Sequence, residues 1–375
     1  MAGEQQGLAI LGRLAEQPAV AFYEGGVASA VTAVLKELGL GFQVDRYGNI
    51  VARIRGRNSG TVPPLAFVAH MDHPGFEAVA NHEGYLIGEA LGGVPAASFG
   101  PGVPLQLIPG GGRRLPAVTA GRHGEESERQ ILIQPAEPVR LDQPCPVVFD
   151  MPDFQVDGDL VRMRAADDLA GCAGILAALA GLSSRLPPGD TYGVFTRAEE
   201  VGLVGARLLA ESGVLSRDTL IVSVESSRAL PGAEIGGGPV IRVGDAGTTF
   251  NANAEAALMR ARETLWGGPE GFRAQRQLMS GGVCEASAFA RWGYRTTGIA
   301  FPLGNYHNGS PEGDVEAEYI NVNDFLGGIE LMVEAVYRVP ERESTNFRRL
   351  FRLVPEDLRE RLIATQIDHD ISSSG

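Results

Sequence analysis

The stretch TYGVFTRAEEVGLVGA, residues 191–206, places two adjacent acids between an apolar run of strand length and a glycine-containing helix start. Like charges as close as those of Glu199 and Glu200 raise each other's pKa, and a cation relieves the repulsion. The dipole of the following helix also stabilises acids at this position, so helix capping remains an alternative. Gly202 and Gly205 permit close backbone approach, which favours a binding role over capping alone.

The sequence on both sides of this stretch continues the alternation of strand and helix. Apolar runs predict strands over 64–69, 191–196, 219–224 and 296–300, and helices over 168–182, 203–212, 254–265, 285–292 and 322–339. Further upstream, a helix is predicted over 26–38, followed by two strands within 42–52. Alternation of this kind is typical of a mostly parallel sheet with helices on both faces, so we expect an α/β fold. Ligands in such sheets collect at the carboxyl ends of the strands.

A segment of different character interrupts this pattern from about residue 75 to residue 156. It is rich in glycine and proline and carries short β-like runs at 84–88, 103–108, 115–118, 130–133 and 147–149, without a helical period. Regularly spaced short strands favour an inserted small β-barrel over a set of long loops. We therefore expect a discontinuous α/β domain over 1–75 and 157–345, a barrel over 76–156, and a C-terminal extension over 346–375 whose role the sequence does not disclose.

Composition excludes several classes of partner. The 375 residues carry a formal net charge of −14, which argues against binding to nucleic acid or to an anionic membrane. The longest apolar segment, 169–182, is shorter than the roughly 20 residues that span a bilayer, and the N-terminus lacks the pattern of a signal peptide. Three scattered cysteines form no disulfide framework, so we expect reduced thiols in a cytoplasmic protein.

Other acids and histidines also follow predicted strands or precede helices. The set consists of His70, Asp72, Asp167, Glu225 and His307. Each has a simpler structural interpretation, because a histidine after a buried strand often only satisfies its hydrogen bonds and aspartates often cap helices. Together with Glu199 and Glu200, they are what a pair of divalent metals needs, with one carboxylate left over to move protons. A carboxylate often orients an imidazole ligand, and this role is open to Asp72.

The ordered set of motifs resembles the tetrahedral aminopeptidase family, the co-catalytic metallopeptidases that include glutamyl aminopeptidases and proteins labelled endoglucanase M. The similarity covers nearly all of residues 5–340. Its matching stretches are DRYGN at 45–49, HMDHPGF at 70–76, LGGV at 91–94, DD at 167–168, TRAEEVGLVGA at 196–206, GGGP at 236–239, GG at 281–282 and YHNGSPE at 306–312.

The resemblance implies two metal ions and a proton acceptor. One metal would be held by His70, Asp167 and Glu225, and the other by Asp167, Glu200 and His307. Asp167 would bridge the two metals, and Glu199 would be the general base. The family also implies a phosphorylase/hydrolase-like core, a cis peptide bond after the bridging aspartate, and often a hollow dodecameric shell. An insertion between Asp72 and Asp167 separates it from related dimeric deacylases, whose extra domain comes later in the chain.

Three departures from the family pattern stand near these residues. Leu169 replaces a usual arginine, Glu225 replaces a usual aspartate, and 283–285 replaces a usual Thr-Asp pair. Glutamate keeps a ligand oxygen but adds a methylene group, which can change metal affinity or spacing. The altered loop at 283–285 bears on substrate preference more than on chemistry.

The expected function is that of a metallo-aminopeptidase acting on short peptides, with Glu199 and Asp72 as catalytic residues. Zinc suits the ligands best, and cobalt or manganese are also compatible with nitrogen and oxygen donors. We expect a homo-oligomer, such as a dodecamer. Hydrolysis of N-acyl amino acids or other amides at the same site, and a metal-binding but inactive shell subunit, remain alternatives. A glycosidase is a weaker one, because its site would be two isolated carboxylates without metals.

Overall fold

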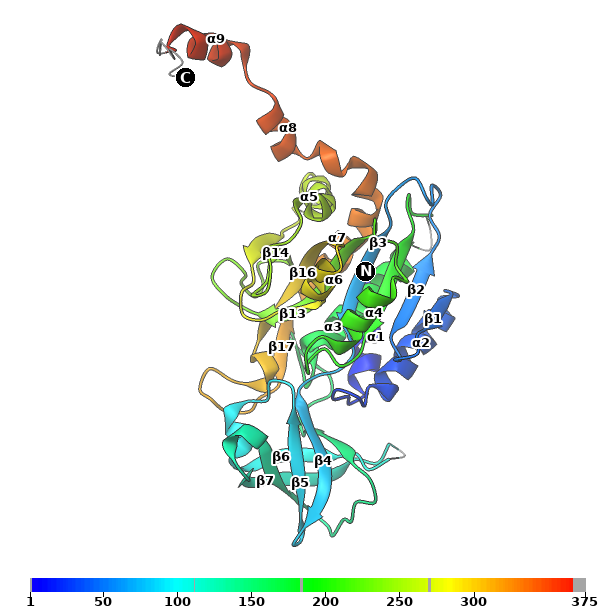
Figure 1. Cartoon of the computed structure of the whole chain (residues 1–375), viewed down its shortest axis with the longest axis vertical. Helices are drawn as coiled ribbons and strands as arrows, with labels where there is room; N and C mark the ends of the chain where they lie inside the picture. The colour runs from blue at the N-terminus through cyan, green and yellow to red at the C-terminus, as the bar shows by residue number, and fades with distance from the viewer. Residues whose placement is uncertain (1, 111, 183–184, 269–270, 367–375) are drawn as a thin grey trace, which may run out of the picture.

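A computed structural model of the chain describes residues 2–110, 112–182, 185–268 and 271–366. It has an α/β core, a β-barrel at one end and a helical arm at the other (Figure 1). The helices are α1 (Ala2–Ala15), α2 (Gly25–Glu37), α3 (Ala166–Gly181), α4 (Val204–Ser212), α5 (Ala252–Trp266), α6 (Glu285–Arg291), α7 (Val322–Arg338), α8 (Asn346–Arg352) and α9 (Glu356–Ala364).

The strands divide between the core sheet and the barrel. Those of the core are β1 (Phe42–Val44), β2 (Ile50–Ile54), β3 (Leu65–His70), β10 (Gln155–Asp157), β11 (Leu160–Met163), β12 (Thr191–Thr196), β13 (Leu220–Arg228), β14 (Val240–Gly244), β15 (Gln275–Leu278), β16 (Arg295–Gly304) and β17 (Glu318–Asn321). Those of the barrel are β4 (Gly75–His82), β5 (Tyr85–Leu91), β6 (Pro101–Leu107), β7 (Leu115–His123), β8 (Gln130–Pro135) and β9 (Cys145–Phe149).

Four parallel strands form the centre of the core sheet, in the order β12, β3, β13, β16. Antiparallel strands flank them, with β2 and β1 on one side and β17, β11 and β10 on the other. The last residues of β12 and β3, Thr196 and His70, pair with each other. The loops that follow these two strands therefore leave the sheet side by side.

Both faces of the central strands are buried, which explains their continuous apolar sequence. Side chains alternate along β3: Phe67 packs into a cluster with α1, α2, α3 and α7, and Val68 packs with α4 and α6 on the opposite face. Helix α1, which the periodicity analysis did not single out, packs against α3 and α7. Within the described residues, no helix has the length and apolar character needed to cross a membrane.

The inserted segment closes into a six-stranded barrel in the order β4-β5-β8-β7-β6-β9. All five predicted β runs are strands, and a sixth, β4, was missed because its sequence GFEAVANH mixes apolar and polar residues. The rings of Phe76 and Phe149 meet edge to face at 6.0 Å inside the barrel. The predicted fold, a mostly parallel α/β sheet with an inserted β-barrel, is confirmed.

The arm consists of α8 and α9 and leads away from the core (Figure 1). Its apolar side chains are exposed, among them Leu350, Phe351 and Leu362. Arg348 ties the start of the arm to the core by hydrogen bonds to the carbonyl oxygen of Ala252 and the side chain of Asn253.

Candidate metal centre

The predicted acids and histidines meet at the carboxyl edge of the parallel strands. Three groups have ligand atoms within 4.8 Å of one another: His70 with Asp167 and Glu225, Asp167 with Glu200 and His307, and His70 with Glu199 and Glu200. The structure therefore brings together all six residues, which come from five separate segments of the chain.

Asp167 lies between the two histidines. Its Oδ1 is 3.4 Å from Nε2 of His70, and its Oδ2 is 3.8 Å from Nε2 of His307. Oε1 of Glu200 is 3.6 Å from the same Nε2. One carboxylate thus faces two separate donor groups, which is the arrangement a bridging ligand requires.

The backbone around Asp167 is not helical, although it lies in the first turn of α3. The Asp167-Asp168 peptide bond is cis, as the resemblance implies. The carboxylate of Glu318, buried in β17, accepts hydrogen bonds from the backbone N–H groups of Asp167 and His307, both at 2.9 Å. Sequence reasoning missed Glu318, because an acid in a short polar strand carries no signal of burial.

Asp72 holds the loop that carries the acid pair. Its two carboxylate oxygens accept the backbone N–H groups of Glu199 at 3.0 Å and Glu200 at 3.1 Å. The predicted contact between this carboxylate and His70 is corrected by the structure. The His70 Nδ1 is 2.9 Å from the backbone carbonyl oxygen of Asp72 and 3.7 Å from the carboxylate, so the backbone orients the ring. Because a carbonyl oxygen only accepts, Nδ1 donates and Nε2 faces Asp167.

An ion pair with a buried carboxylate also fixes this loop. Glu24, fully buried, accepts hydrogen bonds from Nε of Arg197 at 2.7 Å and from the N–H of Ala198 at 3.0 Å. Glu24 belongs to the N-terminal segment just before α2, and no local pattern connects it with Arg197. From Ala198 to Glu200, each backbone N–H group is therefore held by a carboxylate.

The barrel also contributes to the site. The carbonyl oxygen of Gly93, just beyond β5, lies 3.2 Å from Nδ1 of His307. A Cβ atom on Gly93 would come within 2.4 Å of that nitrogen, so only glycine fits here. Gly92 approaches Glu200 in the same way, with its hypothetical Cβ 3.0 Å from the Glu200 side chain. This explains why the LGGV stretch belongs among the matching motifs.

The cluster carries more negative charge than its nearby hydrogen-bond donors can neutralise. Burial raises the pKa of Glu200 well above its usual range, and the charges of Glu199 and Asp167 add to the shift. Burial likewise raises the pKa of Glu199 to about 8. For His70 burial lowers the pKa, but the nearby carboxylates, with Glu199 foremost, outweigh it and hold the pKa well above normal. Without cations, these acids would have to retain protons.

The donor set fits divalent metal ions. Within the described residues, Oδ1 of Asp167 and Oε1 of Glu200 are buried and accept no hydrogen bond. Buried carboxylate oxygens rarely lack a partner, and these two face imidazole nitrogens at distances too long for a good hydrogen bond. Oxygen and imidazole donors of this kind suit zinc, cobalt and manganese.

The three departures lie in and beside this cluster. Leu169 packs in the main hydrophobic cluster with 1% exposure, in surroundings suited to its apolar side chain. Glu225 was predicted at the end of a strand, but β13 continues to Arg228 because it pairs with β16 beyond the end of β3. Glu285 accepts the hydroxyl groups of Thr196 and Ser223, both at 3.0 Å, and so links β12 to β13 beneath the site.

The close contact at Gly93 generates a first prediction. Gly93→Ala should push the His307 ring away from Glu200 and Asp167, because the new methyl group overlaps the ring nitrogen. Elemental analysis should then find less bound metal per chain than in the parent protein. Gly41→Ala is the matched control, since nothing lies within 4 Å of its Cβ position. Equal metal content in both variants would contradict the proposed role of His307.

The uncompensated charge generates a second prediction. Protein stripped with a chelator should gain thermal stability when zinc or cobalt is added, because a ligand that binds only the folded state stabilises it. The gain is about 2.7 kcal/mol at a free metal concentration 100 times Kd. Scanning calorimetry measures it, and Glu200→Gln should reduce it. Glu211→Gln, at an exposed position of α4, should leave the gain unchanged. An unchanged melting temperature on metal addition would argue against the centre.

Comparison with known proteins points to a family of peptidases. Residues 139–324 match the sequence profile described as M42 glutamyl aminopeptidase. No curated protein matches the sequence.

Among solved structures, the chain is similar to an aminopeptidase from the archaeon Desulfurococcus kamchatkensis, with 21% identity, a TM-score of 0.76 and coverage of 92% of this chain and 98% of that one. It is also similar to the TET1 peptidase of Pyrococcus horikoshii, which assembles into a tetrahedron or an octahedral shell, with 22% identity, a TM-score of 0.73 and coverage of 88% and 99%. A Thermotoga maritima protein described as an endoglucanase follows with 23% identity, a TM-score of 0.66 and coverage of 90% and 99%.

At these identities the structural likeness establishes the fold, and the profile match carries the family assignment. The profile spans the segment that supplies Asp167, Glu199, Glu200, Glu225 and His307. By this match, the chain belongs to the M42 glutamyl aminopeptidase family of peptidases.

Proposed function

We propose that the protein is a dinuclear metal-dependent aminopeptidase that removes N-terminal residues from short peptides. The observation that carries this proposal is the pair of donor groups that share Asp167, with a further acid, Glu199, beside them. Family membership supports the peptidase chemistry, and the geometry of the acids supports the metal dependence.

The two metal sites would share Asp167 and differ in their other residues. His70, Asp167 and Glu225 would hold one ion, and Asp167, Glu200 and His307 the other. Metal ions in such sites polarise a substrate carbonyl group and lower the pKa of water. Zinc is the first candidate, with cobalt or manganese as alternatives.

Glu199 is suited to move the proton. Its side chain is 13% exposed, whereas that of Glu200 is 4% exposed, so Glu199 is the more accessible member of the pair. Burial raises its pKa in the metal-free protein, and bound cations would lower it again, which would leave a carboxylate able to accept a proton as a general base must. It would take a proton from the attacking water and pass it to the leaving amine. Asp72 acts as a positioning residue, since it fixes the backbone of Glu199.

We also propose a homo-oligomer, with a dodecamer as the expected form, because TET peptidases of the same fold form closed assemblies. A reducing, cytoplasmic environment is part of the same proposal. Cys145, Cys172 and Cys284 are buried free thiols, which supports it.

A peptide panel tests the proposed reaction. Protein loaded with zinc or cobalt should release the first residue from peptides with a free N-terminus and leave their N-acetylated counterparts intact. Mass spectrometry identifies the products. Cleavage of the acetylated set would indicate an acyl-amide hydrolase instead. If neither set were cleaved by protein that holds about two metals per chain, the inactive shell subunit would be the better description.

Replacing the general base separates chemistry from metal binding. Glu199→Gln keeps the side-chain shape but removes the proton acceptor, so kcat should fall by about 100-fold to 10,000-fold. Metal content, measured by elemental analysis, should stay at the parental value. Glu211→Gln serves as the neutral control. Loss of metal in Glu199→Gln would instead make Glu199 a ligand.

A further inference from the structure

Phe22 has a backbone conformation that its bulky side chain disfavours. Its φ is +75°, a region that bulky residues rarely adopt and that glycine occupies without cost. The residue is nevertheless 54% exposed. Among the residues that the structure describes, Phe22 joins none of the hydrophobic clusters and its ring contacts no other aromatic ring. The ring therefore contributes little to the stability of this chain.

The backbone of Phe22 is held firmly against the loop that carries Glu199. Its N–H donates to Oε1 of Glu24 at 2.9 Å, and its carbonyl oxygen accepts from Nη2 of Arg197 at 2.9 Å. Glu24 and Arg197 pair with each other, and Glu24 also accepts the N–H of Ala198. Phe22 and Glu199 thus belong to one hydrogen-bonded unit, so the backbone that carries the ring is held to the loop of the proposed general base.

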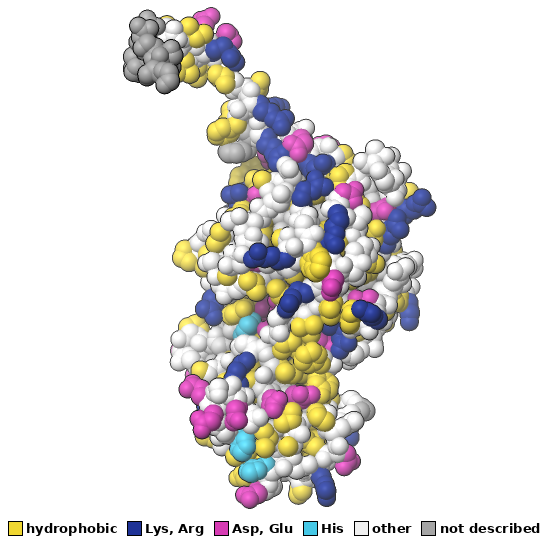
Figure 2. Space-filling model, in the orientation of Figure 1, with side chains coloured by type: hydrophobic (Ala, Val, Ile, Leu, Met, Phe, Trp, Pro, Cys, Tyr) yellow, Lys and Arg dark blue, Asp and Glu magenta, His cyan; other side chains and the backbone are white. Residues whose placement is uncertain are grey.

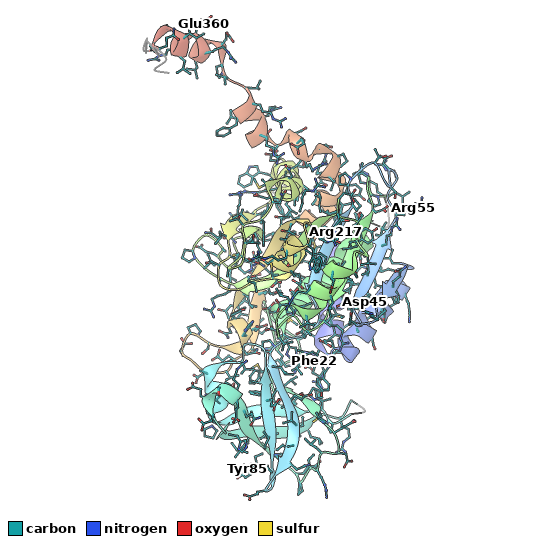
Figure 3. All side chains as sticks on the ribbon, viewed as in Figure 1. Phe22, Asp45, Arg55, Tyr85, Arg217 and Glu360 are labelled. Carbon is teal, nitrogen blue, oxygen red and sulfur yellow. The ribbon has the colours of Figure 1, made fainter. Side chains whose placement is uncertain are left out.

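The figures place this unit at the neck where the core meets the barrel. Phe22 lies beside the lower end of α2, just above the barrel strands (Figure 3). Hydrophobic side chains are exposed along the same neck (Figure 2). The next residue, Tyr23, donates its hydroxyl group to Glu77 on β4 and so ties the segment to the barrel as well. The neck is also where the carboxyl ends of the parallel strands carry the acids, because β3 leads directly into β4.

We propose that Phe22 forms an apolar subsite that receives a side chain of the bound peptide next to the cleaved bond. The proposal rests on the proposed peptidase function. Its substrates would be peptides with an apolar residue on one side of that bond. A strained and exposed aromatic residue, whose backbone is bonded to the loop of the proposed general base, is the kind of local conflict that accompanies function.

Replacement of Phe22 by glycine tests the subsite. Phe22→Gly removes the ring and also the backbone strain, so the melting temperature should stay the same or rise. By contrast, kcat/KM for peptides with an apolar residue at the first or second position should fall about tenfold or more. Peptides with small or polar residues at both positions should be cleaved as before. Trp266→Ala, which removes another exposed ring at the end of α5, is the matched control and should change neither quantity.

Binding provides a readout that does not require turnover. In the Glu199→Gln background, calorimetry should show a dissociation constant for an apolar dipeptide that rises about tenfold on adding Phe22→Gly. Equal affinity of the Glu199→Gln protein with and without Phe22→Gly would overturn the subsite while leaving the peptidase function intact. A Phe22→Gly protein that changes its assembly size at unchanged peptide affinity would assign the ring to a contact between copies. Absence of any peptide binding or cleavage by the parent chain would overturn both proposals.

Discussion

The concentration of buried negative charge at the ends of the parallel strands is the constraint around which the structure is organised. The acids in this region divide into two groups by the hydrogen bonds they receive. Asp72, Glu24 and Glu318 accept backbone N–H groups and fix the loops. Asp167 and Glu200 are the inner acids. Each has one carboxylate oxygen that accepts no hydrogen bond from any of the described residues. The outer group holds the inner group in place, and the inner group keeps oxygens free for cations.

Much of this arrangement could be predicted from the sequence because it is local to each strand. Buried parallel strands read as continuous apolar runs, and an acid or histidine directly after such a run stands out. His70 and Glu199 were identified in this way, and the topology then explains why they meet, since β3 and β12 are parallel neighbours. Glu225 was correctly identified as a residue of the site, but it was predicted to follow its strand, whereas it lies within β13. Nothing in the sequence shows that β13 continues beside β16 after β3 has ended.

The rest could not be predicted because it depends on contacts between distant segments. Glu24 pairs with Arg197 and Glu318 binds the backbone of Asp167, and neither acid stands in a distinctive local pattern. The Asp72 carboxylate shows a related limit. Its spacing from His70 suggested a contact between the two side chains, whereas the backbone carbonyl makes that contact and the carboxylate holds another loop. Spacing in sequence identified the residue but not its hydrogen bonds.

The approach of Gly93 to His307 bears on how this fold can be altered by recombination. A barrel inserted into an α/β core looks like an independent module that could be exchanged between proteins. Here the barrel supplies a carbonyl oxygen to a ring of the core, and the neighbouring Gly92 leaves room for Glu200. A chimaera that joined this core to an unrelated barrel would preserve both hydrophobic interiors and still lack one wall of the centre. The two units are separate in architecture, but the site needs residues of both, so the core and this barrel would have to be kept together.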